Sequence, residues 1–305
     1  MTMRELKGMI VPNITPFKND AARSLDLERI DKLVDFIIDK QNADAIIAVG
    51  TTGESTSLSH DEKEVVILRT LKAVKERVPV LAATGSANTQ EAIAMTQFCE
   101  RSGIAGVLLV SPYYIRPNQD GLYQHFSAVA QNTKLPIILY NHPGRTGVSI
   151  QVDTLIRLAQ RYENIIGIKD CPNNLALSTD VARRCRSELG RSFSFLTGED
   201  EFIYMNICLG GDGAIAASGH LLGNEIKQMI DLFNKGQVEQ ARKLQFMITD
   251  LIRMLFVMPS PAPLKAALDI LTEGEELGGP VRLPLVDAPE DLKQKLKIEL
   301  ARVKG

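Results

Sequence analysis

A lysine at the end of a short apolar run is the first residue here whose position suggests chemistry. The stretch IIGIKD (165–170) is apolar up to Lys169, which predicts a buried strand with an amine at its tip. Burial among aliphatic side chains disfavours the ammonium form and lowers the pKa of a lysine. A pKa about three units below the usual value of about 10.4 leaves roughly half of the amine neutral near pH 7.4. A neutral amine in an apolar pocket is the nucleophile of Schiff-base chemistry.

A tyrosine ends the preceding predicted strand, PIILYNH (136–142). Adjacent strands lie about 4.8 Å apart, so the hydroxyl of Tyr140 could reach an adduct on Lys169 and shuttle protons to and from it. Side chains alternate along a strand, so Lys169 shares a face with Gly167, and we expect the glycine to leave open volume beneath the amine. The alternative is a lysine that extends to solvent beside a tyrosine that only packs.

These residues need a scaffold that brings strand ends together. Eight short apolar runs alternate with amphipathic stretches such as 25–40, where Leu27, Ile30, Leu33, Val34 and Ile37 share one helical face. Eight such units in about 220 residues predict an α/β protein of the (β/α)8 TIM-barrel type, and a doubly wound sheet is the alternative. The predicted strands are 9–15, 45–50, 78–84, 106–112, 136–142, 165–170, 193–198 and 213–218.

The rest of the chain predicts further helices. Amphipathic stretches at 61–77 and 89–103 fit helices between strands, and segments near 237–257, 262–272 and 288–303 follow the last strand. We expect the barrel to occupy residues 1–233 and a helical extension packed on it to occupy residues 234–305.

Polar residues gather where the predicted strands end, and this is the edge at which barrel enzymes carry their reactive groups. The turn GTTGES (50–55) offers two hydroxyls and exposed backbone N–H groups, which suit a carboxylate. An ordinary Gly/Thr turn before a helix is the alternative. The other polar strand ends are 111–114, 140–142, 169–170, 197–200 and 218–220.

Composition excludes several classes of protein. The net charge of −2 provides no basic field for nucleic acid or an anionic membrane. The N-terminus has no signal-peptide pattern, and no apolar stretch approaches the roughly 20 residues of a bilayer helix, so we expect a cytoplasmic protein with no membrane partner. The four cysteines lack CxxC spacing and the four histidines lack an HExxH pattern, so we expect no metal site.

Several separated motifs appear in one order along the chain: GTTGE (50–54), SPYY (111–114), YNxPGRTG (140–147), GIKD (167–170) and GGDGAI (210–215). With these motifs, residues 9–270 resemble the dihydrodipicolinate synthase/N-acetylneuraminate lyase family of class I aldolases. The resemblance implies a lysine Schiff base with pyruvate or another 2-keto acid, and neither a metal nor an organic cofactor. It also implies a homotetramer built as a dimer of dimers.

The resemblance also assigns roles to residues. It implies that Lys169 is the nucleophile and Tyr140 the proton-transferring phenol. Thr51 would connect Tyr140 to Tyr114, which in the synthases comes from a neighbouring subunit. The hydroxyl and backbone groups of Thr51 and Thr52 would bind the pyruvate carboxylate, and the backbone would line the pyruvyl pocket at Gly198 and Ile215.

Arg145 distinguishes branches of the family. In the synthases, the arginine of this P-x-R-T-G stretch binds the carboxylate of L-aspartate 4-semialdehyde, and a guanidinium suits bidentate carboxylate binding. GIKD and GDGAIAASG (211–219) instead look more like 2-keto-3-deoxygluconate-type aldolases. We therefore expect pyruvate and an aldehyde as substrates, with aspartate semialdehyde as the first candidate and a 2-keto-3-deoxysugar acid as the alternative. A metal-dependent barrel enzyme and a non-catalytic keto-acid-binding paralogue are the other hypotheses.

Feedback inhibition by lysine at a dimer interface is a further family trait. The usual asparagine and one histidine of that allosteric site correspond here to Ala87 and Lys63, and an added cation repels a lysine ammonium. We expect weak or absent inhibition by lysine. The positions that match the allosteric site are Ser55, His60, Glu91 and Tyr113.

Overall fold

The computed structural model describes residues 3–171 and 174–305, so residues 1, 2, 172 and 173 of the predicted barrel range lie outside the described residues. Its strands follow one another from β1 to β8 in a closed barrel, which confirms the predicted (β/α)8 fold and excludes the doubly wound sheet. All eight predicted strands are present. They are β1 (Gly8–Pro12), β2 (Ala45–Ala48), β3 (Val80–Ala83), β4 (Gly106–Val110), β5 (Ile137–Asn141), β6 (Ile165–Asp170), β7 (Ser194–Thr197) and β8 (Gly213–Ile215).

Helices follow the strands and continue beyond the last one, so the predicted C-terminal helical extension is also confirmed. The helices between strands are α1 (Leu27–Asp39), α2 (His60–Val74), α3 (Thr89–Ser102), α4 (Gln119–Gln131), α5 (Pro143–Thr146), α6 (Val152–Arg161), α7 (Leu175–Glu188) and α8 (Ile203–Cys208). Those after β8 are α9 (Gly219–Asn234), α10 (Val238–Met254), α11 (Ala262–Leu271) and α12 (Glu290–Lys304).

Local sequence explains where helix α1 begins and which face it buries. The side chain of Asp26 accepts a hydrogen bond from the backbone N–H of Arg29, as a helix N-cap does. Ile30, Leu33, Val34 and Ile37 are buried along one face, as the spacing predicted, and burial of each aliphatic side chain stabilises the fold by about 1.5–3 kcal/mol.

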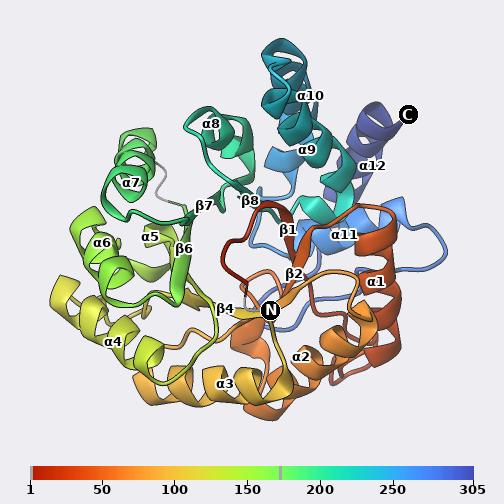
Figure 1. Cartoon of the computed structure of the whole chain (residues 1–305). Coiled ribbons are helices and arrows are strands. Elements are labelled where there is room, and N and C mark those ends of the chain that lie inside the picture. The colour runs from red at the N-terminus through yellow and green to blue at the C-terminus, as the bar shows by residue number, and fades with distance from the viewer. Residues whose placement is uncertain (1–2, 172–173) are drawn as a thin grey trace. The chain divides into compact units, whose positions relative to one another are not determined.

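The chain comprises two compact units, residues 1–8 with 79–215 and residues 9–78 with 216–305. In the first unit, strands β3 to β8 pair in parallel, and α3, α4 and α6 lie along the outer side of β4 to β6 (Figure 1). In the second unit, β1 pairs with β2, where Val11 is opposite Ile46. The expected division into 1–233 and 234–305 remains a prediction.

The strands of the first unit are buried except at the last residues of β3 and β4. All six residues of β6 are buried, Lys169 and Asp170 included. Successive side chains on a strand point to opposite faces, so the side chains of Lys169 and Asp170 lie in different surroundings. Among residues 3–171 and 174–305, no helix combines the length and apolar character needed to cross a bilayer.

Candidate active site

Strands β5 and β6 place Tyr140 beside Lys169. The two residues are register partners, and Leu196 of β7 is the partner of Lys169 on the other side. Only 6% of Lys169 and 5% of Tyr140 is exposed to solvent, and the lysine Nζ lies 4.3 Å from the centroid of the tyrosine ring. The lysine is therefore not a strand-end residue that extends into bulk water. Its amine is enclosed and in contact with an aromatic face.

The surroundings of Lys169 favour its neutral form. Burial lowers the pKa of the amine below its usual value, because the ammonium ion loses hydration. The nearby Cys171, Asp200 and Glu199 act in the opposite direction, and the Arg145 guanidinium reinforces the lowering. The net direction is the one that nucleophilic attack on a carbonyl requires.

Two glycines control the space around this amine. A Cβ on Gly198 would lie 2.2 Å from Cε of Lys169 and 2.4 Å from Sγ of Cys171, so the lysine side chain depends on the missing side chain at 198. The expectation of open volume above Gly167 was wrong. A Cβ there would meet the backbone oxygen of Ser194 at 2.6 Å and Cδ1 of Ile138 at 2.8 Å, so this glycine allows close packing of neighbouring strands.

A hydrogen-bond network ties the loop that carries Arg145 to the strand ends. Nδ2 of Asn141 donates to Oδ1 of Asp170 at 2.9 Å. Oδ1 of Asn141 accepts a hydrogen bond from the backbone N–H of Ile150, also at 2.9 Å. Ser178 donates to the other oxygen of Asp170 at 3.1 Å, which joins helix α7 to the network. The residues that alternate with Tyr140 and Lys169 on the two strands thus hold the surrounding loops in place.

Arg145 lies on the short helix α5 and is exposed. Its guanidinium acts electrostatically on both Lys169 and His142, so its charge is felt at the buried amine. Helix α5 ends at Gly147, whose φ of 74° belongs to the left-handed region that glycine adopts readily. A Cβ at that position would also meet Nε of Arg116 at 2.5 Å, so the loop after β4 packs closely against the end of α5.

The tyrosines after β4 differ from Tyr140 in their exposure. Tyr114 is 92% exposed and has a φ of 73°, an uncommon backbone conformation for a residue with a Cβ, whereas 37% of Tyr113 is exposed. Neither belongs to the buried part of the site within one chain. Ile215 ends strand β8 and is buried.

The remaining predicted residues belong to different parts of the chain. Thr51, Thr52, Ser55 and His60 lie in the unit of residues 9–78 and 216–305, whereas Glu91 lies in the unit of Lys169. His60 is paired with Glu64 at 3.3 Å, and Glu91 accepts a hydrogen bond from Ser86 at 2.8 Å. The substrate-binding role of the two threonines and the allosteric role of the other residues stay predictions.

Sequence reasoning missed an ion pair that supports the GTTGE turn. Glu54, the last residue of that turn, has a φ of 54° and forms an ion pair of 2.6 Å with Lys265, and both side chains are 1% exposed. Lys265 also donates to the backbone oxygens of Thr15 and Pro280, each at 2.8 Å. The backbone N–H of Arg282 donates to the second oxygen of Glu54 at 2.9 Å. The pair anchors the turn to α11, and no spacing in the sequence indicates it.

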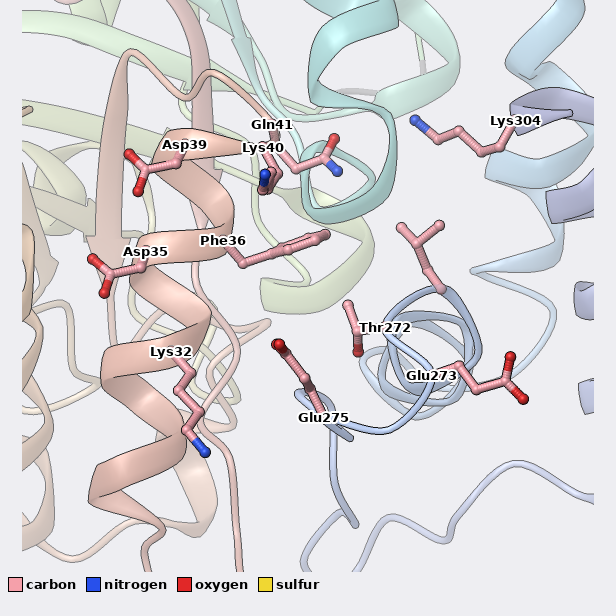
Figure 2. A pocket seen from close by; sticks show the side chains of 11 residues that line it. Lys32, Asp35, Phe36, Asp39, Lys40, Gln41, Thr272, Glu273, Glu275 and Lys304 are labelled. Atoms are coloured by element: carbon pink, nitrogen blue, oxygen red, sulfur yellow. The ribbon is translucent and has the colours of Figure 1, made fainter.

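A cavity of about 760 Å³ in the unit of residues 9–78 and 216–305 lies between α1, the end of α11 and Lys304 (Figure 2). Phe36 points from α1 into this cavity (Figure 2). The cavity is lined by residues of both charges, for example the cations Lys32 and Lys40 and the anions Asp35 and Glu275. It contains none of the residues predicted to act in catalysis, so the strand ends that hold Lys169 remain the candidate active site.

Comparison with known proteins agrees with this geometry. The model of the dihydrodipicolinate synthetase family matches residues 5–303. The 4-hydroxy-tetrahydrodipicolinate synthase of Syntrophus aciditrophicus is 41% identical over 291 residues, which cover 95% of this chain and 96% of that protein. The crystal structure of dihydrodipicolinate synthase from Aquifex aeolicus has a TM-score of 0.91 at 36% identity, covering 98% of both chains. The structure of DHDPS from Cyanidioschyzon merolae with lysine bound has a TM-score of 0.92 at 34% identity, also covering 98% of both chains.

Proposed function

Because the chain belongs to the dihydrodipicolinate synthetase family, we propose that it condenses pyruvate with L-aspartate 4-semialdehyde to form 4-hydroxy-tetrahydrodipicolinate. The observation that carries this proposal is the buried amine of Lys169, 4.3 Å from the centroid of the Tyr140 ring at the ends of paired strands. The chain covers nearly the full length of its synthase relatives, so the whole catalytic unit of those proteins has a counterpart here.

The amine of Lys169 attacks the keto carbon of pyruvate, and the resulting carbinolamine loses water to give an imine. Removal of a proton from the methyl carbon gives an enamine, which attacks the aldehyde carbon of the second substrate. Tyr140 is the group beside the amine that would carry protons in the carbinolamine and hydrolysis steps. Thr51 and Thr52 would bind the pyruvate carboxylate, together with backbone groups at Gly198 and Ile215.

Arg145 supports aspartate semialdehyde rather than a neutral sugar aldehyde as the acceptor. Its guanidinium is exposed and its charge acts on the buried amine, which supports a role in binding a carboxylate that enters the site. The alternative substrate, a 2-keto-3-deoxysugar acid, would use the same lysine, and the GIKD motif is the feature that favours it.

The proposed assembly is a cytoplasmic homotetramer made of two dimers. An exposed Tyr114 with a left-handed φ, followed by an Ile115 that is 62% exposed, fits a segment that a second subunit covers. In that dimer, Tyr114 would enter the partner's active site and complete a proton relay with Thr51 and Tyr140. Mass measurement in solution tests the assembly, and a monomer at assay concentration would contradict it.

Lysine would bind weakly or not at all at the proposed allosteric residues Ser55, His60, Glu91 and Tyr113. The departures at Ala87 and Lys63 support this expectation, although a relative from Cyanidioschyzon merolae has been crystallised with lysine. Inhibition of turnover by micromolar lysine would contradict it.

Two experiments test the function. Borohydride reduction in the presence of pyruvate should attach one reduced adduct to Lys169 and none to a Lys169→Ala variant, and labelling of another lysine would refute the mechanism. Arg145→Ala should lower kcat/KM for aspartate semialdehyde about 100-fold, close to the 3 kcal/mol upper range of a hydrogen bond to a charged group. It should leave pyruvate trapping intact. Arg157→Ala, a change of an exposed arginine on α6, is the matched control. Arg145→Ala should barely change turnover of a neutral sugar aldehyde, and an equal loss with both aldehydes would contradict the carboxylate-binding role of Arg145.

A further inference from the structure

Three residues that can bind metals follow three consecutive strands of the first unit. His142 comes directly after β5, Cys171 directly after β6 and Glu199 two residues after β7. One ligand atom from each side chain lies within 4.8 Å of those of the other two. The expectation of no metal site was based on the spacing of cysteines and histidines along the chain. Such spacing cannot reveal residues that are distant in sequence and are brought together at the ends of parallel strands.

The distances are close to those of a tetrahedral zinc site. Zinc bonds of about 2.0–2.3 Å to nitrogen, oxygen and sulfur place neighbouring ligand atoms roughly 3.3–3.8 Å apart. The three side chains therefore need to approach one another by no more than about 1.5 Å to bind one ion. Cys171 is fully buried, and Glu199 lies in the short turn between β7 and α8, where a side-chain movement does not require a strand to shift.

An independent feature also indicates a ligand. Nδ1 of His142 is buried and makes no hydrogen bond within the described residues. A buried polar atom without a partner costs free energy, and a cation bound at this nitrogen would remove that cost.

The charges of the three ligands suit a dication. Burial raises the pKa of the Cys171 thiol, so a bound ion must displace its proton; the imidazole, thiolate and carboxylate then carry two negative charges together, which neutralise one divalent ion. A neutral complex is less costly in a partly buried site than a net charge, and it is not repelled by the nearby Arg145 and Lys169. A thiolate and an imidazole prefer zinc to magnesium or calcium, which take oxygen ligands.

The cluster is adjacent to the proposed nucleophile. A Cβ on Gly198 would lie 2.2 Å from Cε of Lys169 and 2.4 Å from Sγ of Cys171, so these two atoms are close to each other. Cys171 also acts electrostatically on the Lys169 amine, so an ion bound to the sulfur would lie near that amine. Three protein ligands leave a fourth position of a tetrahedral ion open, and the amine of Lys169 is a nitrogen donor that could fill it.

We propose that His142, Cys171 and Glu199 form an inhibitory site for Zn²⁺, which binds beside Lys169 and prevents its reaction with pyruvate. Binding of the ion does not depend on the proposed function. The inhibition rests on it, because only a Schiff-base enzyme loses activity when this amine is occupied. The reaction itself needs no metal under this proposal, so a chelator relieves inhibition and does not abolish turnover.

Cobalt spectroscopy tests the site without using activity. Titration of the full-length protein with Co²⁺ should give a thiolate-to-cobalt charge-transfer band that saturates at one ion per chain and is displaced by Zn²⁺. Cys171→Ser should abolish the band, and His142→Asn should weaken Zn²⁺ binding by about 100-fold or more. His142→Asn is the second variant because Cys171 is fully buried and its replacement could impair folding. Cys185→Ser, which changes another buried thiol, and Cys208→Ser, which changes an exposed one, are the matched controls.

The cobalt spectrum and the trapping assay separate failure of the metal site from failure of the proposed function. A band that persists in Cys171→Ser or disappears in Cys208→Ser overturns the site, because the ion then binds another thiol. Zn²⁺, at concentrations that displace the cobalt band, should reduce borohydride trapping of pyruvate on Lys169 in the wild type but not in His142→Asn. Undiminished trapping in the wild type overturns the inhibitory role. Failure of trapping without zinc refutes the proposed function instead, while the spectrum still reports on the metal site.

Discussion

Replacement of Gly198 by alanine should impair the reaction of Lys169 far more than it impairs folding. The φ of Gly198 lies outside the left-handed region, so the backbone itself accepts an alanine. The added Cβ would lie 2.2 Å from Cε of Lys169, whereas two carbon atoms in contact prefer about 3.5–4.0 Å. The lysine side chain must therefore move by more than about 1 Å, because the backbone at Gly198, whose N–H donates to the backbone oxygen of Asp170 at 3.0 Å, yields less readily.

The magnitude follows from that displacement. A misplacement of about 1 Å at a reacting group can lower the rate about 100-fold, which corresponds to roughly 2.7 kcal/mol of transition-state free energy. The second collision, at 2.4 Å with Sγ of Cys171, adds to the overpacking. Overpacking of one methyl group destabilises a fold by about 1–3 kcal/mol, so the Gly198→Ala variant should remain folded at room temperature if the wild type has ordinary stability.

The assay measures the rate of borohydride-trapped adduct formation with pyruvate, next to kcat/KM and a thermal unfolding curve. Gly121→Ala on α4 is the matched control, since its Cβ would meet Pro117 at 3.2 Å and Asn118 at 3.3 Å and no lysine. That control should trap pyruvate at the wild-type rate. A folded Gly198→Ala variant with the wild-type trapping rate would refute the reasoning, because the amine would then tolerate the displacement.

Two predictions concern stability. Lys265→Met should lower the free energy of unfolding by about 3–5 kcal/mol in a urea titration, because it leaves the buried carboxylate of Glu54 without its cation. Acid should destabilise the fold through His125 and His220, whose pKa values burial lowers to about 4 from 6.5. The unfolded chain binds more protons between these pH values, so the free energy of unfolding falls as pH falls from 6.5 to 4, by at most roughly 3 kcal/mol per histidine.

The controls for these two predictions are available in the chain. Lys295→Met on α12 changes a largely exposed lysine and should alter the free energy of unfolding by no more than about 0.5 kcal/mol. Equal effects of Lys295→Met and Lys265→Met would contradict the importance of the buried pair. For the histidines, His220→Gln should reduce the pH slope of the free energy of unfolding between pH 6.5 and 4. An unchanged slope would show that His220 is protonated to the same extent in the folded and unfolded chain.

Sequence alone determined the elements and the edge at which the chemistry lies. Apolar periodicity is a local property, and it predicted all eight strands and the faces of helices such as α1. The residue pair at the centre of the site could also be predicted from the sequence. Tyr140 and Lys169 each lie near the end of a strand, and consecutive strands of a parallel barrel pair with each other. Motif order then identified the family that the comparisons show.

Tertiary structure decided what depends on residues that are distant in sequence and close in space. Gly198 looked like a pocket-lining backbone position, and only packing shows that its missing side chain makes room for Lys169. Gly167 was expected to leave open space, which side chains and backbone from the neighbouring strands occupy instead. The ion pair of Glu54 with Lys265 and the cluster of His142, Cys171 and Glu199 leave no periodic pattern in the sequence. Their distances are set by strand register and by the packing of loops and helices on the strand ends, and neither is encoded in any single segment.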